Sequence, residues 1–310
     1  MDEFELIRRY FKALTPARRG VRLGIGDDAA LLQVPLGHEL AVTTDTLVAG
    51  RHFVEDAAAE DVGWKSLAVN LSDLAAMGAE PRWFTLALTL RLADPVWLKG
   101  FAEGLRASAQ AAGVTLVGGD TTQGPLSVTI TAMGSLPAKK AIRRAGAKAG
   151  DVICVTGTLG DAALALELGV AAPAALKTRL NRPMPRLKAG RALCGVAHAA
   201  IDLSDGLAGD LSHILEASGV GAEILATKLP VSREFATLAP AESRLRLQTI
   251  GGDDYELCFC LPQSKLDTVR RKLGVPVTVI GKITRKSGLR ILDAAGKPVP
   301  LAPHGYRHFV

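Results

Sequence analysis

Aromatic side chains are scarce in this 310-residue chain, in which Phe, Trp and Tyr together make up 5% of the residues. Few rings are therefore available to stack on nucleic-acid bases. The formal charge of +6 would by itself suggest a polyanionic partner. However, the sequence contains no RNP motif, no zinc-finger spacing and no long basic run. We therefore expect no nucleic-acid partner, and the net charge leaves the nature of the partner open.

Cysteine is also rare, and the four cysteines have neither metal-site nor redox spacing: Cys154, Cys194, Cys258 and Cys260. On a strand, Cys258 and Cys260 would share one face because they lie two residues apart. We expect buried free thiols. Secreted proteins of this kind would more often carry disulfides, so these thiols favour a reducing, cytoplasmic location.

Long hydrophobic runs are missing too. The alanine-rich stretch from Asp161 to Leu176 is interrupted by Glu167 and is too short to span a bilayer. The amino-terminal run MDEFELIRRYFKAL is acidic first and amphipathic after, unlike a signal peptide. We therefore expect a soluble intracellular protein with no membrane partner.

Strand-like and helical segments alternate along the chain. Apolar residues at helical spacing predict an amphipathic helix near the start, and further helices are predicted from about Asp61 to Met77 and from Pro95 to Ala111, where Gly113 ends the helix. The runs WFTLALTLRL, VTLVGGD and LSVTITAMGSL are typical of strands. Strands that return by hairpin-like segments favour an α+β fold over a regular βαβ series.

The length fits two domains of average size. Residues 135–151 contain a proline, two glycines and five basic residues, a composition that is typical of a linker. We expect an amino-terminal α+β domain over residues 1–137 and a carboxyl-terminal α+β domain over residues 138–310.

The distribution of aspartate is the main anomaly. Nine aspartates lie within two residues of a Gly, Ser or Thr, mostly where strands turn: Asp27, Asp28, Asp45, Asp73, Asp120, Asp202, Asp205, Asp253 and Asp254. Any one of them could be a turn or helix-capping residue. Together they would repel one another and need a cation, and oxygen ligands without His or Cys select Mg²⁺, Mn²⁺ or Ca²⁺. The hydroxyls of Thr43 and Thr44 could add neutral oxygen ligands.

The usual nucleotide and nucleophile motifs do not occur. No Walker-type P-loop is present. The segment Gly24–Ala29 formally matches G-x-G-x-x-G/A, but it follows no clear strand, and its two carboxylates would oppose a bare pyrophosphate. With divalent cations between them, the same aspartates could hold a polyphosphate. No G-x-S-x-G elbow exists, and neither His52 nor His198 lies near a Ser or Cys nucleophile in sequence.

Seven motifs, in one order, resemble the thiamine-monophosphate kinase family: GIGDDAALL, TTDTLVAGRHF, AVNLSDLAAMGAEP, GGDTTQG, AGDVICVTGTLGD, AIDLSDGL and GGDDYELCF. The resemblance spans most of the chain, with a family-like GYRHF ending. It implies the two-domain α+β fold of the aminoimidazole-ribonucleotide-synthetase-like superfamily and a homodimer whose amino-terminal sheets form a barrel. It also implies the last step of thiamine diphosphate biosynthesis: ATP and thiamine monophosphate give ADP and thiamine diphosphate, with several Mg²⁺ ions.

The resemblance carries site residues over by position. Eight match metal-binding positions: Asp28, Thr43, Thr44, Asp45, Asp73, Asp120, Asp202 and Asp205. Four match nucleotide contacts: Gly119, Asp120, Arg144 and Ser204. Three match thiamine-phosphate contacts: His52, Asp253 and Tyr306. Family members often have Glu where this chain has Asp253, so a direct substrate contact from this shorter side chain is in question.

No dedicated catalytic base is expected, because a substrate phosphate is already largely ionised near neutral pH. Direct in-line transfer would then depend on positioning and charge neutralisation. Related enzymes are disfavoured by what the chain lacks. A selenophosphate synthetase needs a Cys near its start, the hydrogenase-maturation relative needs a carboxyl-terminal Cys, and an aminoimidazole ribonucleotide synthetase needs a D-G-V-G-T-K-type segment. A non-catalytic nucleotide or metal sensor with the same scaffold remains the alternative from another class.

Overall fold

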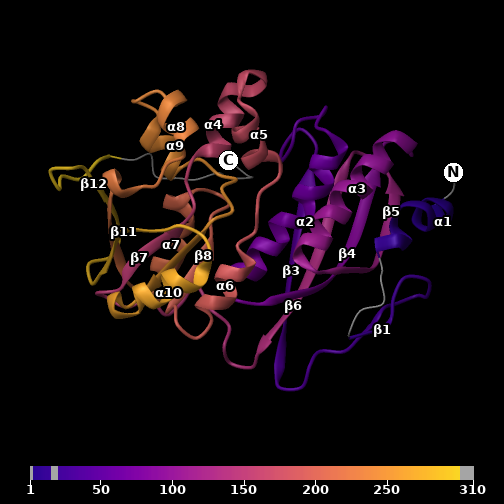
Figure 1. Cartoon of the computed structure of the whole chain (residues 1–310), viewed down its shortest axis with the longest axis horizontal. Coiled ribbons are helices and arrows are strands. Elements are labelled where there is room, and N and C mark those ends of the chain that lie inside the picture. The colour runs from indigo at the N-terminus through magenta and orange to yellow at the C-terminus, as the bar shows by residue number, and fades with distance from the viewer. Residues whose placement is uncertain (1–2, 15–19, 301–310) are drawn as a thin grey trace. The chain divides into compact units, whose positions relative to one another are not determined.

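The computed structural model describes residues 3–14 and 20–300. The chain divides into two compact units (Figure 1). The first comprises residues 1–74 and 79–139, and the second comprises residues 75–78 and 140–310. Within the described residues, no helix is both long enough and apolar enough to cross a membrane.

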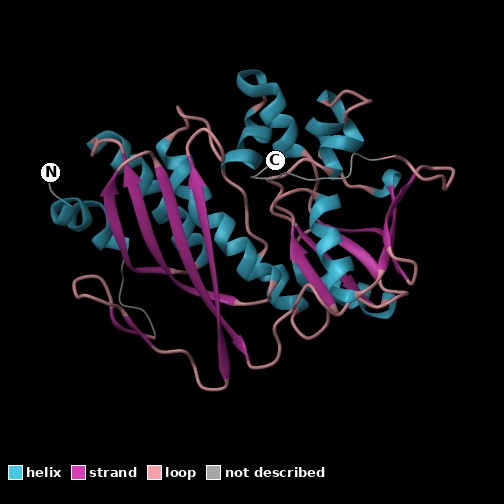
Figure 2. Cartoon of the chain, turned by 180° about the vertical axis from the view of Figure 1, so that it is seen from behind, coloured by secondary structure: helices cyan, strands magenta, loops and turns pink. Residues whose placement is uncertain are grey.

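The first unit is built on an open four-stranded sheet in the order β3-β6-β4-β5, in which only β4 and β5 are parallel. Two long helices lie over one face, and none of the described helices of this unit covers the other face (Figure 2). The elements are β1 (Val21–Leu23), β2 (Leu31–Leu32), β3 (His38–Val48), α2 (Ala59–Ala76), β4 (Glu80–Leu90), α3 (Pro95–Ala112), β5 (Thr115–Gln123) and β6 (Ser127–Pro137).

Helix α3 begins and ends where the sequence predicts. The Asp94 side chain accepts a hydrogen bond from the Val96 N–H at 2.9 Å, and Pro95 occupies the first turn. Gly113 ends the helix with a left-handed φ of 71°. Helix α3 lies very close to α2, because a Cβ at Gly104 would stand 1.9 Å from the Glu60 carbonyl oxygen. Only glycine allows this helix pair.

The amino-terminal segment is helical but irregular. It consists of α1 (Glu3–Leu6), a π-helical turn (Ile7–Phe11) and a 3₁₀ turn (Lys12–Leu14). The predicted amphipathic pattern is confirmed by the burial of Phe11 and Leu14. The Phe11 ring meets Phe101 of α3 edge-on, with 6.3 Å between the ring centroids. This contact anchors the segment to the first unit.

The second unit contains a six-stranded sheet in the order β12-β9-β11-β7-β10-β8, antiparallel except for the pair β12 and β9. Its strands are β7 (Val152–Thr156), β8 (Ala199–Asp202), β9 (Gly221–Leu225), β10 (Leu257–Leu261), β11 (Val277–Thr284) and β12 (Gly288–Leu292). Its helices are α4 (Asp161–Leu168), α5 (Ala174–Asn181), α6 (Leu187–Leu193), α7 (Leu207–Ser218), α8 (Arg233–Leu238), α9 (Arg244–Thr249) and α10 (Leu266–Leu273).

Strand β10 separates two cores. Cys258 and Cys260 belong to the cluster that contains the buried residues of α7, whereas Phe259 belongs to the cluster with α6 and α10. The predicted shared face of the two cysteines is therefore confirmed. All five residues of β10 are buried. The expectation of buried thiols is wrong for Cys194, which is partly exposed because it follows the last turn of α6 instead of lying in the sheet.

The thiols should therefore differ in reactivity. Burial raises the pKa of Cys154 to about 12 and also raises the pKa of Cys258 and Cys260 well above the ordinary thiol value. Since the thiolate is the reactive form, we expect N-ethylmaleimide to modify only Cys194 in the native protein at pH 8. Mass spectrometry should show one adduct before denaturation and four after it, because all four thiols are free. Native Cys194→Ser should show none, and rapid labelling of a second native thiol would contradict this burial.

Candidate functional site

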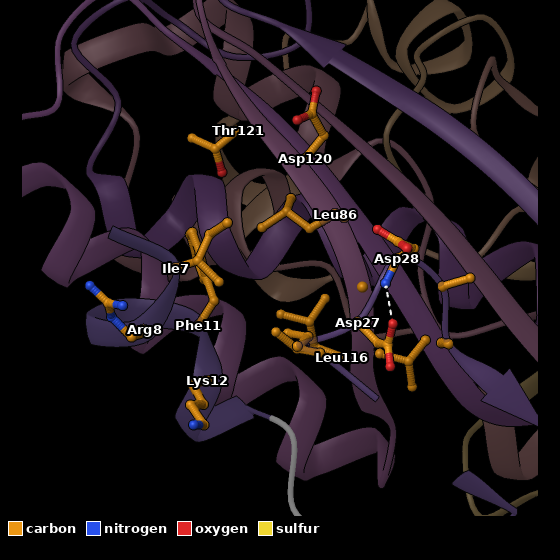
Figure 3. Close-up of a pocket in the computed structure, with 17 residues that line it drawn as sticks. Ile7, Arg8, Phe11, Lys12, Asp27, Asp28, Leu86, Leu116, Asp120 and Thr121 are labelled. Atoms are coloured by element: carbon orange, nitrogen blue, oxygen red, sulfur yellow. Dashed lines mark hydrogen bonds between the residues drawn. The ribbon is translucent and has the colours of Figure 1, made fainter. Parts of the chain in front are cut away.

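A cavity of about 630 Å³ lies in the first unit beside the parallel strands β4 and β5 (Figure 3). Three separate parts of the chain line it: the amino-terminal helical segment, the loop between β1 and β2, and the middle of β5 with one residue of β4. The lining residues are Ile7, Arg8, Phe11, Lys12, Ile25, Gly26, Asp27, Asp28, Ala29, Ala30, Leu86, Leu116, Val117, Gly118, Gly119, Asp120 and Thr121.

Glycine at position 119 allows the wall of this cavity to form. The register of the two strands pairs Gly119 with Leu86 and Asp120 with Ala87. Gly119 has a φ of 154°, and a Cβ there would stand 1.9 Å from the Leu86 carbonyl oxygen. A side chain would force the strands apart. The glycine therefore lets β5 approach β4 and brings the next residue, Asp120, to the cavity lining.

The glycine-rich loop forms the opposite wall. It connects β1 and β2, which pair antiparallel, and no helix begins within it. The expectation that the segment follows no strand is wrong, because β1 ends directly before Gly24. The loop still lacks the strand–turn–helix setting of a dinucleotide-binding fingerprint, because it leads into β2 and not into a helix. The Asp28 N–H donates to Asp27 Oδ1 at 2.9 Å (Figure 3). This bond ties the Asp27 side chain to the loop backbone.

The cavity has charges of both signs. Asp27, Asp28 and Asp120 contribute carboxylates, and Arg8 and Lys12 contribute cationic groups from the amino-terminal segment (Figure 3). Sequence reasoning missed the two basic residues, because nothing in the run IRRYFK shows that it lies beside β5. A cavity of this composition suits an anionic ligand together with a hard cation.

A second group of predicted residues lies where β3 meets α2. The Thr43 Oγ1 donates to Asp73 Oδ2 at 2.5 Å, and the Asp45 N–H donates to Asn70 Oδ1 at 3.1 Å. Asn70, which the sequence analysis missed, is completely buried. Thr44 points the other way and its hydroxyl pairs with that of Thr131 at 2.9 Å. The side chains of Thr43 and Thr44 are thus on opposite faces of β3, as the two-residue period of a strand requires.

His52 is held in a defined orientation just beyond β3. Its Nδ1 accepts a hydrogen bond from the Val48 N–H at 3.0 Å, so the proton of the neutral ring resides on Nε2. The Lys65 Nζ donates to the His52 carbonyl oxygen at 3.2 Å. Any hydrogen bond that the ring donates to a ligand must therefore come from Nε2.

In the second unit, Asp202 ends β8, and Ser204 and Asp205 form the loop before α7. A further aspartate that sequence reasoning missed organises this loop: Asp210 Oδ2 accepts from the Ser204 N–H at 3.0 Å and from the Asp205 N–H at 3.1 Å. Burial, and next the charge of Asp205, raise the pKa of Asp210 to about 7. Its position five and six residues after the loop, in the first turn of a helix, is the signal that could have identified it.

The remaining predicted residues of the second unit lie in loops. The Asp253 N–H donates to the Ser204 carbonyl oxygen at 2.8 Å, which brings a predicted substrate contact and a predicted nucleotide contact side by side. Arg144 is exposed in the segment before β7. Tyr306 lies outside the described residues.

Within the described residues, no group of three or more His, Cys, Asp or Glu side chains is arranged to hold a metal ion. The predicted ligands instead occur in smaller sets, with Thr43 beside Asp73 on one hand and Asp28 and Asp120 along the cavity on the other. All of these donors are carboxylate or hydroxyl oxygens, a set that fits Mg²⁺ and does not fit zinc. The chemistry of the residues therefore agrees with the predicted ion.

Comparison with known families defines the class of protein. Residues 26–136 match the amino-terminal domain of AIR synthase related proteins, and residues 148–293 match the carboxyl-terminal domain of the same proteins. The two matches fall in the two structural units in turn. The fold is thus the two-domain, mixed α/β architecture of this class.

Full-length relatives narrow the class. The thiamine-monophosphate kinase of Escherichia coli K12 is 48% identical over 319 residues, covering 99% of this chain and 98% of the relative. The crystal structure of the Stenotrophomonas maltophilia thiamine-monophosphate kinase is 44% identical, with a TM-score of 0.88 over 96% of this chain and 98% of that chain. AaThiL complexed with AMPPCP and TMP is 31% identical, with a TM-score of 0.79 over 92% of each chain. The chain therefore belongs to the thiamine-monophosphate kinase family.

The pKa of Asp210 predicts how folding stability depends on pH. The folded-state pKa of about 7 lies above the ordinary value of 3.8, so the native state binds the proton more tightly than the unfolded chain. This contribution to stability is complete below about pH 4 and is lost as the pH rises to 7, by about 4 kcal/mol at most. We expect the free energy of unfolding to fall less between pH 5 and pH 8 in Asp210→Asn than in the wild type. Urea unfolding in the presence of EDTA measures this difference. Asp267→Asn, at an exposed helix position, is the control. The same dependence of the free energy of unfolding on pH in all three proteins would contradict the raised pKa.

Proposed function

We propose that this protein transfers the γ-phosphoryl group of ATP to thiamine monophosphate, giving ADP and thiamine diphosphate. The observation that carries the proposal is the full-length similarity to AaThiL, which has been solved with both AMPPCP and TMP. The similarity extends over both units, and the matching motifs contain nearly all the candidate site residues. On the same basis, the protein performs the last step of thiamine diphosphate biosynthesis. We also propose a cytoplasmic location, because all four cysteines are free thiols.

The site residues divide by role in this proposal. Metal ligands are assigned to Asp28, Thr43, Thr44, Asp45, Asp73, Asp120, Asp202 and Asp205. The proposed nucleotide contacts are Gly119, Asp120, Arg144 and Ser204. The proposed contacts of the thiamine phosphate are His52, Asp253 and Tyr306. The geometry favours Thr43 over Thr44 as a side-chain ligand, because only the Thr43 hydroxyl contacts Asp73. Thr44 would have to contribute through its backbone.

Mg²⁺ ions, when bound, supply the charge neutralisation that a P-loop lysine supplies in other kinases. The protein's own part is to position the reactants. The aspartate-bearing loops and β5 orient ligand oxygens, and His52 donates from Nε2 because Nδ1 is occupied. Arg8 and Lys12 add positive charge at the cavity, where the phosphates of a nucleotide would otherwise meet only carboxylates. No residue needs to abstract a proton, since the attacking phosphate oxygen is already ionised, and we propose direct in-line transfer without a phosphoenzyme.

Turnover distinguishes this proposal from a non-catalytic sensor. We expect ADP release in a coupled assay with ATP and MgCl₂ only when thiamine monophosphate is present. Asp73→Ala should reduce the rate by at least about 100-fold, because it removes a proposed ligand and the acceptor for Thr43. Its Tm should stay within about 4 °C of the wild type. The exposed Asp56→Ala is the matched control. No substrate-dependent ADP release in the wild type would refute the kinase proposal, and full activity of Asp73→Ala would refute the ligand assignment.

We further propose that the protein is a homodimer in which two amino-terminal sheets join into a barrel. Strand β3 is an edge strand of 11 residues, and it exposes Leu40 and Val42 on the face that no helix of its unit covers (Figure 2). Long edge strands with exposed apolar residues tend to pair with another chain. A barrel removes both edges.

Light scattering with size-exclusion chromatography tests the dimer. The wild type should elute at twice the 32.5 kDa chain mass, and Val42→Lys should shift the mass toward the monomer because it places a charge on the joined face. Val96→Lys, at an exposed valine of α3 on the covered side of the sheet, should leave the mass unchanged. A monomeric wild type, or a Val42→Lys protein that remains dimeric, would contradict the proposed interface.

A further inference from the structure

A buried carboxylate at the start of β10 collects donors from three elements of the second unit. Glu256 is completely buried. Its oxygens accept from Arg179 Nη2 of α5 at 2.8 Å and from Arg186 Nε, just before α6, at 2.6 Å, and a second bond comes from Arg186 Nη2. The Thr156 hydroxyl of β7 donates to Glu256 Oε2 at 2.6 Å. Charge-assisted bonds from two guanidinium groups are among the strongest that a protein makes.

Glycine at position 157 leaves room for the Glu256 carboxylate. A Cβ at Gly157, which has a φ of 56°, would stand 2.1 Å from Glu256 Oε1, so a larger residue there would displace this side chain. Burial lowers the pKa of Arg179, but the carboxylates of Glu256, Asp254 and Asp161 raise it by more. Replacing a buried ion pair with apolar residues is often neutral or stabilising. A pair of arginines on one buried glutamate therefore points to a role in geometry more than in stability.

The backbone beside Glu256 is strained. Three non-glycine residues in the described part of the chain have a positive φ, and two of them are Asp253 at 66° and Tyr255 at 49°. A positive φ is unfavourable for a residue with a side chain, so such conformations persist only where their surroundings hold them. Asp254, between them, is buried and accepts from the Gly160 N–H at 3.0 Å and 3.1 Å.

This strained loop, Gly251–Tyr255, is joined to the loop that follows β8. The Asp253 N–H donates to the Ser204 carbonyl oxygen at 2.8 Å and the Tyr255 N–H donates to the Leu203 carbonyl oxygen at 2.7 Å. In the reverse direction, the Leu203 N–H donates to the Glu256 carbonyl oxygen at 2.8 Å. A Cβ at Gly252 would stand 2.4 Å from the Ser204 carbonyl oxygen. These contacts couple the conformations of the two loops.

We propose that Arg186, assisted by Arg179, is a positioning residue that clamps Glu256 and thereby holds the Gly251–Tyr255 loop in the conformation that presents Asp253 to thiamine monophosphate. In this proposal Arg186 acts through Glu256, to which it is hydrogen-bonded. The inference rests on the proposed function, in which Asp253 contacts the substrate. Releasing the clamp allows the strained residues to relax, so it weakens acceptor binding more than it slows phosphoryl transfer.

Kinetics of Arg186 variants test the clamp. In Arg186→Met we expect the KM for thiamine monophosphate to rise about tenfold, while kcat and the KM for ATP stay within about threefold. Arg186→Lys keeps the charge but loses the planar guanidinium group, so its KM for thiamine monophosphate should lie between those of the wild type and Arg186→Met. This variant still tests the clamp if Arg186→Met does not fold. The matched control, Arg246→Met, removes an exposed Arg–Glu pair with Glu167 in the same unit and should change none of the three constants.

Amide hydrogen exchange separates failure of the clamp from failure of the proposed function. Whether or not the wild type turns over thiamine monophosphate, the amides of residues 252–257 should exchange faster in Arg186→Met or Arg186→Lys than in the wild type and in Arg246→Met. Unchanged exchange in that loop overturns the clamp. Faster exchange with an unchanged KM for thiamine monophosphate in an active enzyme overturns the link to substrate binding. Impairment of kcat and of the KM values for ATP and thiamine monophosphate by the same factor also overturns this link.

Discussion

The second unit depends on carboxylate groups that are buried beneath its loops and accept hydrogen bonds from them. Glu256 is bound by two arginines and a threonine, Asp254 by the Gly160 N–H, and Asp210 by the N–H groups of Ser204 and Asp205. A buried carboxylate is unfavourable unless donors surround it, so each of these side chains restricts its donors to one arrangement. The loops that carry the proposed ligands consequently have positions set by residues beneath them.

The first unit achieves its positioning by the close approach of backbones. Glycine at position 119 lets β5 approach Leu86 of β4, and glycine at position 104 lets α3 approach Glu60 of α2. These contacts leave no room for a Cβ. They therefore restrict the distance between neighbouring strands or helices more tightly than side-chain packing would. Asp120 on β5 and Asp73 on α2 take their positions from these contacts. The environments of the two side chains differ: Asp73 accepts a hydrogen bond from the Thr43 hydroxyl, whereas Asp120 lines the cavity.

Sequence patterns were sufficient to predict several elements and insufficient to predict how the candidate site residues are arranged. The helical run from Pro95 and its ending at Gly113 predicted α3, and the two-residue spacing of Cys258 and Cys260 predicted their common face. The same period shows why Thr43 and Thr44 could not both be side-chain ligands on one face, a consequence that the motif match concealed. Arg8 and Lys12 could not be predicted, since only folding brings the amino-terminal segment beside β5.

What the sequence alone determined is the family, because seven motifs in a fixed order specify it even though each is short. It also determined the kind of chemistry, since many aspartates without a paired base and nucleophile favour cation-assisted transfer of an ionised group. Only the tertiary structure decided which residues hold those aspartates in place. Asp210, Arg179 and Arg186 lie outside the seven motifs, and Asn70 and Glu256 lie inside two of them without matching a ligand position. The roles of all five arise from hydrogen bonds. Most of these bonds join residues far apart in sequence, which no local pattern records.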